Sequence, residues 1–292
     1  MKIVALFAAL IAERLFSQFF RWREFRWLDP LFDVGIRASA RLHGVAHYAW
    51  VIGVLLIAVA PVVILRIALD DTLLGLPYFA LSVVVLFLSL GPEDLGEVVD
   101  HWCRAVSRDD SQTEEEYSAR LLESSVDDGI RVRDEIAGAV LAQANNRVFA
   151  VLFWFVIFGP IGAWAVRVAD LARRRAGVLD AATCERSADD VHAWLAWAPA
   201  RLTALGFSLA GHYDAAIESW RGAALAGMPR SQSNAMLLQQ VGLAAMSLVR
   251  QTDESDEDWA VRRVSRARKL VYRTLGFWLV GIALLTLVGV LV

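Results

Sequence analysis

Long apolar stretches alternate along this chain with strongly charged ones, in blocks too long for the core of a soluble domain. Residues 49–69, AWVIGVLLIAVAPVVILRIAL, are apolar apart from Arg66 near the end. A stretch of about 20 such residues is long enough to cross the hydrocarbon layer of a bilayer as a helix. The same argument predicts a multi-pass, all-α membrane protein with five apolar helices, at about 1–20, 49–69, 74–91, 148–168 and 274–292.

Two polar segments separate these helices. Residues 92–147 repeat apolar positions every three or four residues, which predicts helices with one buried face. Residues 169–273 are also expected to be helical, with an amphipathic helix near 191–211. We expect both segments to lie in the cytoplasm and to pack together, following an amino-terminal membrane part at 1–91. The acidic run 251–258, QTDESDED, is interpreted as a solvated loop or a helix start.

The distribution of arginines conflicts with a simple crossing at 148–168. Arg173, Arg174 and Arg175 follow this stretch, and a second basic cluster precedes 274–292. Basic residues near span ends favour the cytoplasmic side, yet one full crossing would separate the two clusters. The sequence FGPIG at 158–162 therefore favours a re-entrant helix, with a return crossing at 191–211 as the alternative.

Composition supports a membrane protein and excludes a nucleic-acid-binding one. The chain is 57% hydrophobic, above the roughly 45–50% of soluble domains. Its 29 basic and 32 acidic residues give a net charge of −3, without the basic face that nucleic acid requires.

Asp189, Asp190, Pro199 and Arg201 interrupt the apolar sequence DDVHAWLAWAPARLTAL at 189–205. A lipid-facing arginine costs about 2.5 kcal/mol or more, so Arg201 should face a cavity, a carboxylate or the membrane surface. Pro199 also leaves the carbonyl near Leu195 without its helical partner, which must then be found elsewhere. The residues therefore predict a site for an anion or a divalent metal ion. In the alternative interpretation, Asp189 is the N-cap of an interfacial helix and Asp190 interacts favourably with the helix dipole in its first turn. Arg201 then extends its guanidinium to water at the membrane surface.

Two further groups are candidates for the same site. Arg104 and Arg108 are four residues apart on one helix face, with Asp109 next, and paired arginines suit a phosphate or carboxylate. For this group, ion pairing at the protein surface is the alternative.

Asn146 and Arg147 are expected to open the membrane helix at 148, either within the site or as interface anchors. No Walker pattern of Gly and Lys is present.

Three motifs in order, VSRDD at 106–110, LFWFVIFGPIGA at 152–163 and ADDVHAWLAWAPARLTAL at 188–205, resemble the AmpE family. That family is itself similar to the CobD/CbiB cobinamide-phosphate synthases. ERLF at 13–16 and LAGHYDAAIESW at 209–220 also resemble AmpE. The chain departs from the synthases at Ala142 and Gln143, where a Glu-Asn pair is typical, and at Val151, where proline is typical. QSNAM at 232–236 only echoes a synthase element.

The resemblance implies a regulator of β-lactamase induction in the bacterial inner membrane, acting with a cytoplasmic cell-wall amidase or another signalling protein. We expect a site for an anionic small molecule at the cytoplasmic face, formed by Arg104, Arg108, Asp109, Asn146, Arg147, Asp189, Asp190 and Arg201. We expect no catalytic residue and no organic cofactor; a divalent metal ion is the alternative. The competing functions are an amide-forming cobinamide-phosphate synthase and, more remotely, a transporter with broken helices.

Overall fold

The structure, a computed structural model, describes residues 26–39, 45–69, 76–90, 94–122, 129–179, 182–223 and 227–287. The expected helix at 1–20 lies outside these residues. Every regular element in the described ranges is helical, as the apolar spacing predicted. The helices form two compact units, which share helices α10 and α13. Each unit is described separately.

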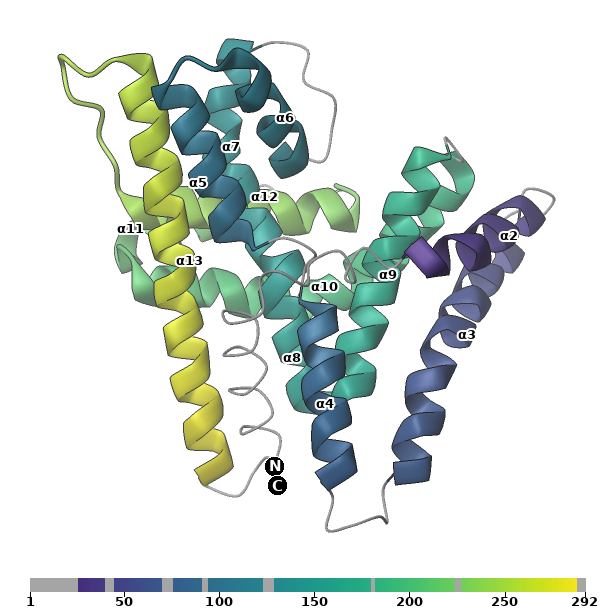
Figure 1. Cartoon of the computed structure of the whole chain (residues 1–292). Helices are drawn as coiled ribbons and strands as arrows, with labels where there is room; N and C mark the ends of the chain where they lie inside the picture. Colours follow the sequence, from purple (N-terminus) through teal and green to yellow (C-terminus); the bar gives the residue numbers. More distant parts are fainter. Residues whose placement is uncertain are drawn as a thin grey trace. The chain divides into compact units, whose positions relative to one another are not determined.

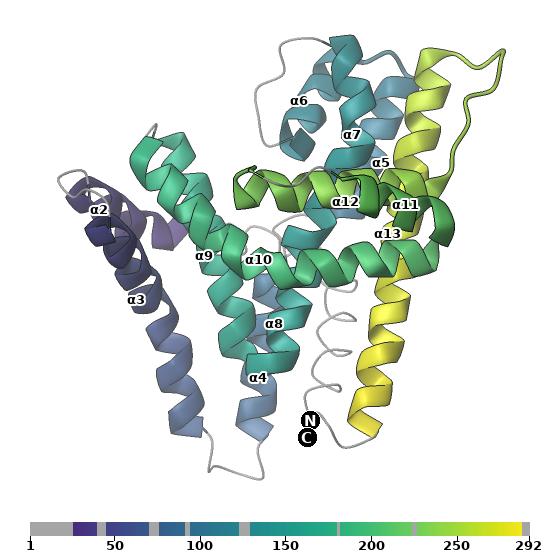
Figure 2. The ribbon, with the colours of Figure 1, turned by 180° about the vertical axis from the view of Figure 1, so that it is seen from behind.

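The first unit contains the apolar helices near the amino terminus and a helical hairpin. Its elements are η2 (Arg26–Leu28), α2 (Asp29–Ser39), α3 (Val45–Leu69), α4 (Leu76–Ser89), α8 (Ala150–Phe158), α9 (Pro160–Val178) and the start of α10 (Ala182–Ala210). Figures 1 and 2 show α4, α8 and α9 side by side, while α3 packs on α2 and α9. Leu28, Val51, Val85, Val168 and Ala188 belong to the shared buried core.

The hairpin of α8 and α9 arises at Gly159 and Pro160. Gly159 has φ +67°, a backbone conformation that costs glycine little. Pro160 then begins α9, where its missing N–H leaves no helical bond unmade. The two helices approach so closely that a Cβ added to Gly162 would lie 2.2 Å from the Trp154 carbonyl oxygen. The apolar stretch expected at 148–168 is thus divided into two helices joined by a reversal.

The second unit has a larger buried core, formed by helices from both polar segments of the sequence. It contains α5 (Leu95–Ser107), α6 (Ser111–Leu122), α7 (Gly129–Ala144), η4 (Asn145–Phe149), the end of α10, α11 (Tyr213–Gly222), α12 (Arg230–Met246) and most of α13 (Asp256–Leu287). Helix α12 packs on α7 and α11, and α6 packs on α5 and α7. Residues such as Trp102, Leu141, Phe207, Leu237 and Val264 are fully buried together.

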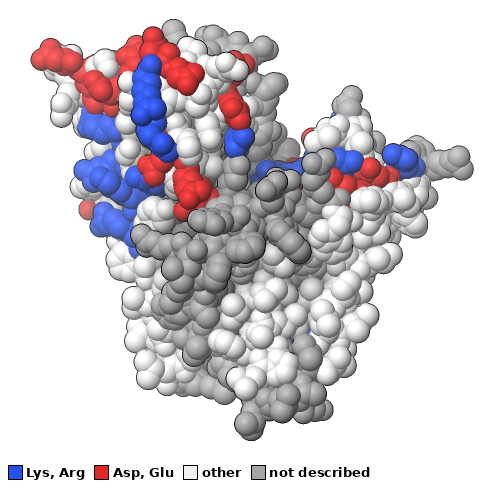
Figure 3. Space-filling view, viewed as in Figure 1, with Lys and Arg blue, Asp and Glu red and all other residues white. Residues whose placement is uncertain are grey.

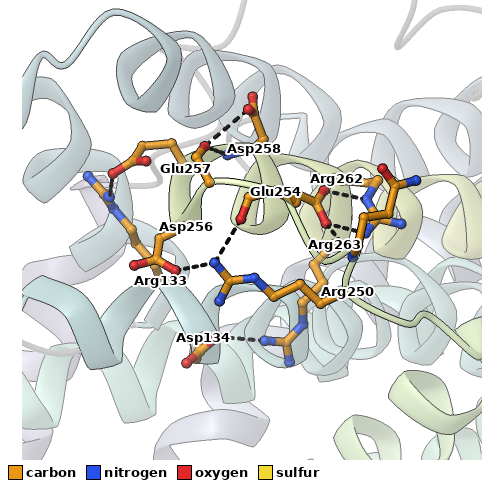
Figure 4. Close-up of polar contacts among 11 residues, drawn as sticks. Arg133, Asp134, Arg250, Glu254, Asp256, Glu257, Asp258, Arg262 and Arg263 are labelled. Carbon is orange, nitrogen blue, oxygen red and sulfur yellow. Dashed lines mark hydrogen bonds and ion pairs between the residues drawn. The ribbon is translucent and has the colours of Figure 1, made fainter.

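Ion pairs link the polar ends of α7 and α13 (Figure 4). Arg133 makes a two-bond contact with Glu114 of α6, at 2.6 and 2.8 Å, and also reaches Glu257 at 2.9 Å. Arg263 donates to Asp134, and Arg262 donates to Glu254. Arg262 holds the pKa of Glu254 below its usual value. The acidic run is therefore a paired helix start, with Asp256, Glu257 and Asp258 facing the positive end of the α13 dipole.

Three described helical stretches are long and apolar enough to cross a membrane: His47–Ala68, Arg133–Phe158 and Asp256–Leu287. Large apolar side chains on their outer faces are exposed, including Ile52, Leu56, Ile57 and Ile64 on α3 and Phe277, Val280, Leu284 and Leu285 on α13. A soluble protein rarely exposes so continuous an apolar surface. The protein is therefore a helical membrane protein.

Candidate functional site

Helix α10 carries the DDVHAWLAWAPARLTAL sequence through both units without a break. Pro199 lies in its interior and is buried. Proline has no N–H to donate to the carbonyl oxygen of Leu195, four residues earlier. The Trp154 indole N–H of α8 donates to that oxygen instead, at 2.8 Å. The expected unpaired carbonyl therefore exists, and a tryptophan from the hairpin supplies its missing partner.

Arg201 is held by groups that do not neutralise its charge. Its guanidinium donates to the side-chain oxygen of Asn234 at 2.9 Å and to the Trp197 carbonyl at 3.0 Å. It also stacks on the Trp197 ring, 4.1 Å from the ring centre. Burial, and secondarily the positive charge of Arg230, lowers the pKa of Arg201. Two arginines thus lie near one another, and the recorded contacts of Arg201 within the described ranges include no carboxylate.

The Arg201–Asn234 contact joins two segments singled out in the sequence. Arg201 belongs to the α10 motif, and Asn234 belongs to QSNAM on α12. Asn234 is 5% exposed, so its amide is fixed by the core and points at the guanidinium from a defined position. A partly buried guanidinium held by a neutral amide keeps its positive charge available to an anionic ligand. This pair is the centre of the candidate site.

The expectation that Asn146 and Arg147 open a helix at 148 is wrong. Residues 145–149 form a π-helical turn inside one helical run that extends from α7 into α8. No glycine or proline occurs between Gly138 and Gly159, so the sequence offers nothing that would begin a new helix at 148. Wide turns of this kind insert an extra residue and are frequent at functional sites.

A hydrogen bond ties the π turn to α10 two residues after Arg201. The Thr203 hydroxyl donates to the side-chain oxygen of Asn145 at 3.2 Å, and both residues are fully buried. Arg147 is 7% exposed and donates to the Gln143 side-chain oxygen at 2.7 Å. Asn146 contacts Asn145 at 3.5 Å. Asn146 and Arg147 therefore take part in hydrogen bonds within the run from α7 to η4, whereas the bond from Thr203 to Asn145 ties the π turn to α10.

Asp189 and Asp190 belong to the first unit, apart from the other six predicted residues. Helix α10 begins at Ala182, seven residues before Asp189. The alternative in which Asp189 caps the helix is therefore wrong, because both aspartates lie inside it. The Tyr48 hydroxyl of α3 donates to Asp190 at 2.5 Å. Next to this contact, His47 and Ser187 are hydrogen-bonded at 2.9 Å and are both buried. Asp190 thus connects α10 with α3.

Arg104, Arg108 and Asp109 lie at the end of α5 and are exposed. Arg104 donates to the Asp100 carbonyl of its own helix, and Arg108 caps α5 through its backbone N–H. Asp109 has φ +54° in the turn before α6. Asp110 accepts hydrogen bonds from Thr113, and these lower the pKa of Asp110. No described contact joins this corner to Arg201, and its part in the site remains a prediction.

A metal ion gains no support from the described residues. Within them, no three His, Cys, Asp or Glu side chains come together as metal ligands. Asp189 and Asp190 are adjacent on one helix, so their side chains diverge by about 100° around its axis.

One polar cluster was missed in the sequence and lies on α9. Asp170 is 1% exposed and pairs with Arg167 at 3.1 Å, Arg173 at 2.7 Å and Arg174 at 3.0 Å. The His192 ring of α10 lies 4.0 Å from the same carboxylate. Burial alone would raise the pKa of Asp170, but the charges of these neighbours hold it well below its usual value. The spacing of Arg167, Arg173 and Arg174 around Asp170, at three and four residues, was the available signal.

Comparisons with known proteins point to the same family as the order of the motifs. A family model described as regulatory signalling modulator protein AmpE matches residues 1–292. The protein named AmpE from Shigella flexneri is 26% identical over 312 aligned positions that cover both chains completely. No solved structure matches.

Two other relatives are named cobalamin biosynthesis protein CobD. The one from Stutzerimonas stutzeri is 30% identical over 213 residues, which are 66% of this chain and 62% of the relative. The one from Chromobacterium violaceum is 29% identical over 150 residues, which are 48% of this chain and 46% of the relative. This chain therefore covers less than two thirds of either relative.

Proposed function

Because the chain belongs to the AmpE family, whose members are regulatory signalling modulators, we propose that it regulates β-lactamase induction from the inner membrane. In this proposal the protein crosses the membrane several times and responds to an anionic molecule derived from the cell wall. It passes the response to a cytoplasmic cell-wall amidase or another signalling protein. The exposed apolar faces of α3 and α13 support the multi-pass arrangement.

The observation that supports binding of an anionic ligand is the environment of Arg201. Its charge is partly desolvated, lies close to Arg230, and is oriented by Asn234 and Trp197 rather than by an acid. A carboxylate or phosphate bound there would make charge-assisted hydrogen bonds and relieve the repulsion between the two arginines.

Helix α10 is the proposed connection between ligand and response. One part of it carries Arg201 in the second unit, and another part carries Asp190, which accepts from Tyr48 in the first unit. A change in the position of α10 on ligand binding would therefore reach α3 through a single helix. Asp190→Ala and Arg201→Ala should each abolish regulation while leaving membrane insertion intact.

The test is β-lactamase induction in a host strain from which this gene has been deleted. Cells complemented with the wild-type gene should show an altered level of β-lactamase activity after exposure to an inducing β-lactam, relative to the deletion strain. Arg201→Ala should behave as the deletion. Arg221→Gln, which removes an exposed arginine on α11, is the matched control and should behave as the wild type. Identical induction in the deletion strain and the complemented strain would refute the regulatory role.

A cobinamide-phosphate synthase is the second candidate function, because two CobD proteins are among the relatives. The residues at the typical Glu-Asn pair argue against it. Ala142 stands where the glutamate is typical and has no carboxylate. Gln143 stands where the asparagine is typical; it is 5% exposed and uses its amide in bonds to Arg147 and the Leu121 carbonyl, so this amide is not free to bind a substrate. Restored cobalamin synthesis in a synthase-deficient strain would favour the enzyme over the regulator.

A further inference from the structure

A cleft of about 510 Å³ lies in the second unit, away from Arg201. Its walls come from the turn between α10 and α11, the end of α12 and one face of α13. The lining residues are Gly211, His212, Ala245, Met246, Arg266, Lys269, Leu270, Tyr272 and Arg273. Gly211 lies ten positions after Arg201, just past the end of α10, which corresponds to about 15 Å along the helix, so the two places are distinct.

The cleft is lined by basic residues that no described acidic residue neutralises. Arg266, Lys269 and Arg273 are spaced by three and four residues and therefore share one face of α13. All three are exposed, and within the described ranges none makes a hydrogen bond or ion pair. None of the nine lining residues is acidic. Figure 3 shows basic side chains gathered along the polar part of α13.

Other arginines of the same helix differ from these three. Arg262 pairs with Glu254, Arg263 pairs with Asp134, and Arg268 pairs with Asp100. Acidic side chains thus pair with the arginines of α13 that face neighbouring elements, whereas the cations of the cleft have no acidic partner in the part of the chain that the structure describes. An arrangement of this kind is expected where an external anion supplies the missing negative charge.

The opposite wall of the cleft adds polar groups in fixed positions. The His212 backbone N–H donates to the Ala245 carbonyl at 2.8 Å, which joins the α10–α11 turn to the end of α12. His212 is also the residue that precedes α11, and its side chain does not cap that helix. The positive end of the α11 dipole therefore begins at the cleft.

The position of the cleft along α13 indicates which anion it suits. Arg273 is followed directly by the apolar part of the same helix, and Phe277, Val280 and Leu284 there are exposed. Several basic residues at the end of a membrane-spanning helix are suited to phosphate groups at the membrane surface. We propose that the cleft lined by Arg266, Lys269 and Arg273 binds a phosphate-bearing anion. The anion is either the headgroup of an acidic lipid or a soluble phosphate compound. This inference does not rest on the proposed regulatory function.

Binding can be measured with the delipidated full-length protein in a neutral detergent. One arm uses inorganic pyrophosphate as a soluble phosphate, and the other uses short-chain phosphatidylglycerol. Phosphatidylcholine of the same chain length is the neutral lipid. Binding of pyrophosphate assigns the cleft to a soluble ligand, and binding of phosphatidylglycerol alone assigns it to a lipid headgroup. Binding of neither anion in preference to phosphatidylcholine would overturn the proposal.

Two double variants test whether the cleft residues are responsible for anion binding. Arg266→Gln/Arg273→Gln should weaken anion binding by about tenfold or more, because two charge-assisted contacts are lost. The control Arg186→Gln/Arg221→Gln removes two exposed arginines elsewhere and should bind as the wild type. Melting without ligand checks that both variants fold. Binding that persists unchanged in the cleft variant would also overturn the proposal. Arg201→Ala should retain anion binding. This result distinguishes a failure of the cleft proposal from a failure of the proposed ligand site at Arg201.

Discussion

The Trp154 indole N–H donates to the Leu195 carbonyl that Pro199 leaves without a helical partner. The contact joins the α8–α9 hairpin to α10 and allows a proline to remain inside a continuous helix. Leaving this partly buried carbonyl without a partner would cost about 1–3 kcal/mol. The pair therefore explains how the AWAPARL sequence remains helical where it passes from the first unit to the second.

Trp154→Phe should destabilise the protein by about 1–3 kcal/mol, because the Leu195 carbonyl loses its donor while an aromatic ring is kept. In a Pro199→Ala background the same substitution should cost less, since the alanine N–H can donate to Leu195 within the helix. Unfolding midpoints of the four proteins in detergent form a double-mutant cycle. Equal costs of Trp154→Phe in both backgrounds would show that the indole contact does not compensate for the proline.

Asn234→Asp should abolish regulation without destabilising the fold. The new carboxylate would lie about where the amide oxygen now meets Arg201, and it would neutralise the guanidinium that the ligand needs. A purely structural role for Arg201 predicts the opposite, since an ion pair would hold the arginine at least as firmly. β-Lactamase induction and the melting midpoint, measured on the same variant, separate the two interpretations.

Asp170→Asn should be strongly destabilising, by about 3–5 kcal/mol, because three arginines would lose the buried carboxylate that they share. The folded pKa of Asp170 is held below its usual value. Its contribution is therefore complete above about pH 4 and is lost as the pH falls through the folded pKa.

Melting midpoints of Asp170→Asn and the wild type should accordingly converge in strong acid and differ at neutral pH. Asp253→Asn, at an exposed aspartate before α13, is the control and should melt as the wild type at neutral pH. A constant difference between the Asp170 variant and the wild type across the acid range would contradict the charge-based explanation.

Gly162→Ala should disrupt the α8–α9 hairpin, because its Cβ would lie 2.2 Å from the Trp154 carbonyl oxygen. Gly276→Ala on α13 is the matched control, since the added Cβ has no atom within 4 Å apart from its chain neighbours and the backbone of its own helix. We expect a lower yield of folded protein and a lower melting midpoint for Gly162→Ala alone. An equal loss of yield and melting midpoint in both variants would show that the close contact in the hairpin is not the cause.

The placement of both polar segments in the cytoplasm remains a prediction that labelling can test. Single cysteines at Ser111 and Arg186, in a chain with Cys103 and Cys184 replaced by serine, should react with a membrane-impermeant thiol reagent from the same side. Labelling of the two positions from opposite sides of oriented vesicles would require a full crossing between them.

The sequence alone determined the class of fold and the family. The length of the apolar stretches is a local property, and only a bilayer satisfies helices that are apolar over so many residues. The need of Leu195 for a partner also followed from Pro199 alone. In the same way, the motif order 106–110, 152–163 and 188–205 indicated the family before any contact was known.

Tertiary structure decided which polar residues meet. Arg201 pairs with Asn234, thirty-three positions away, and Asp190 pairs with Tyr48, from an apolar helix that the sequence had marked only as a span. The π turn at Asn145 and the burial of Asp170 depend on packing against α10. Periodicity along one helix defines its faces but does not say which neighbour covers each of them. The partners of a charged side chain therefore emerge only when the helices have packed.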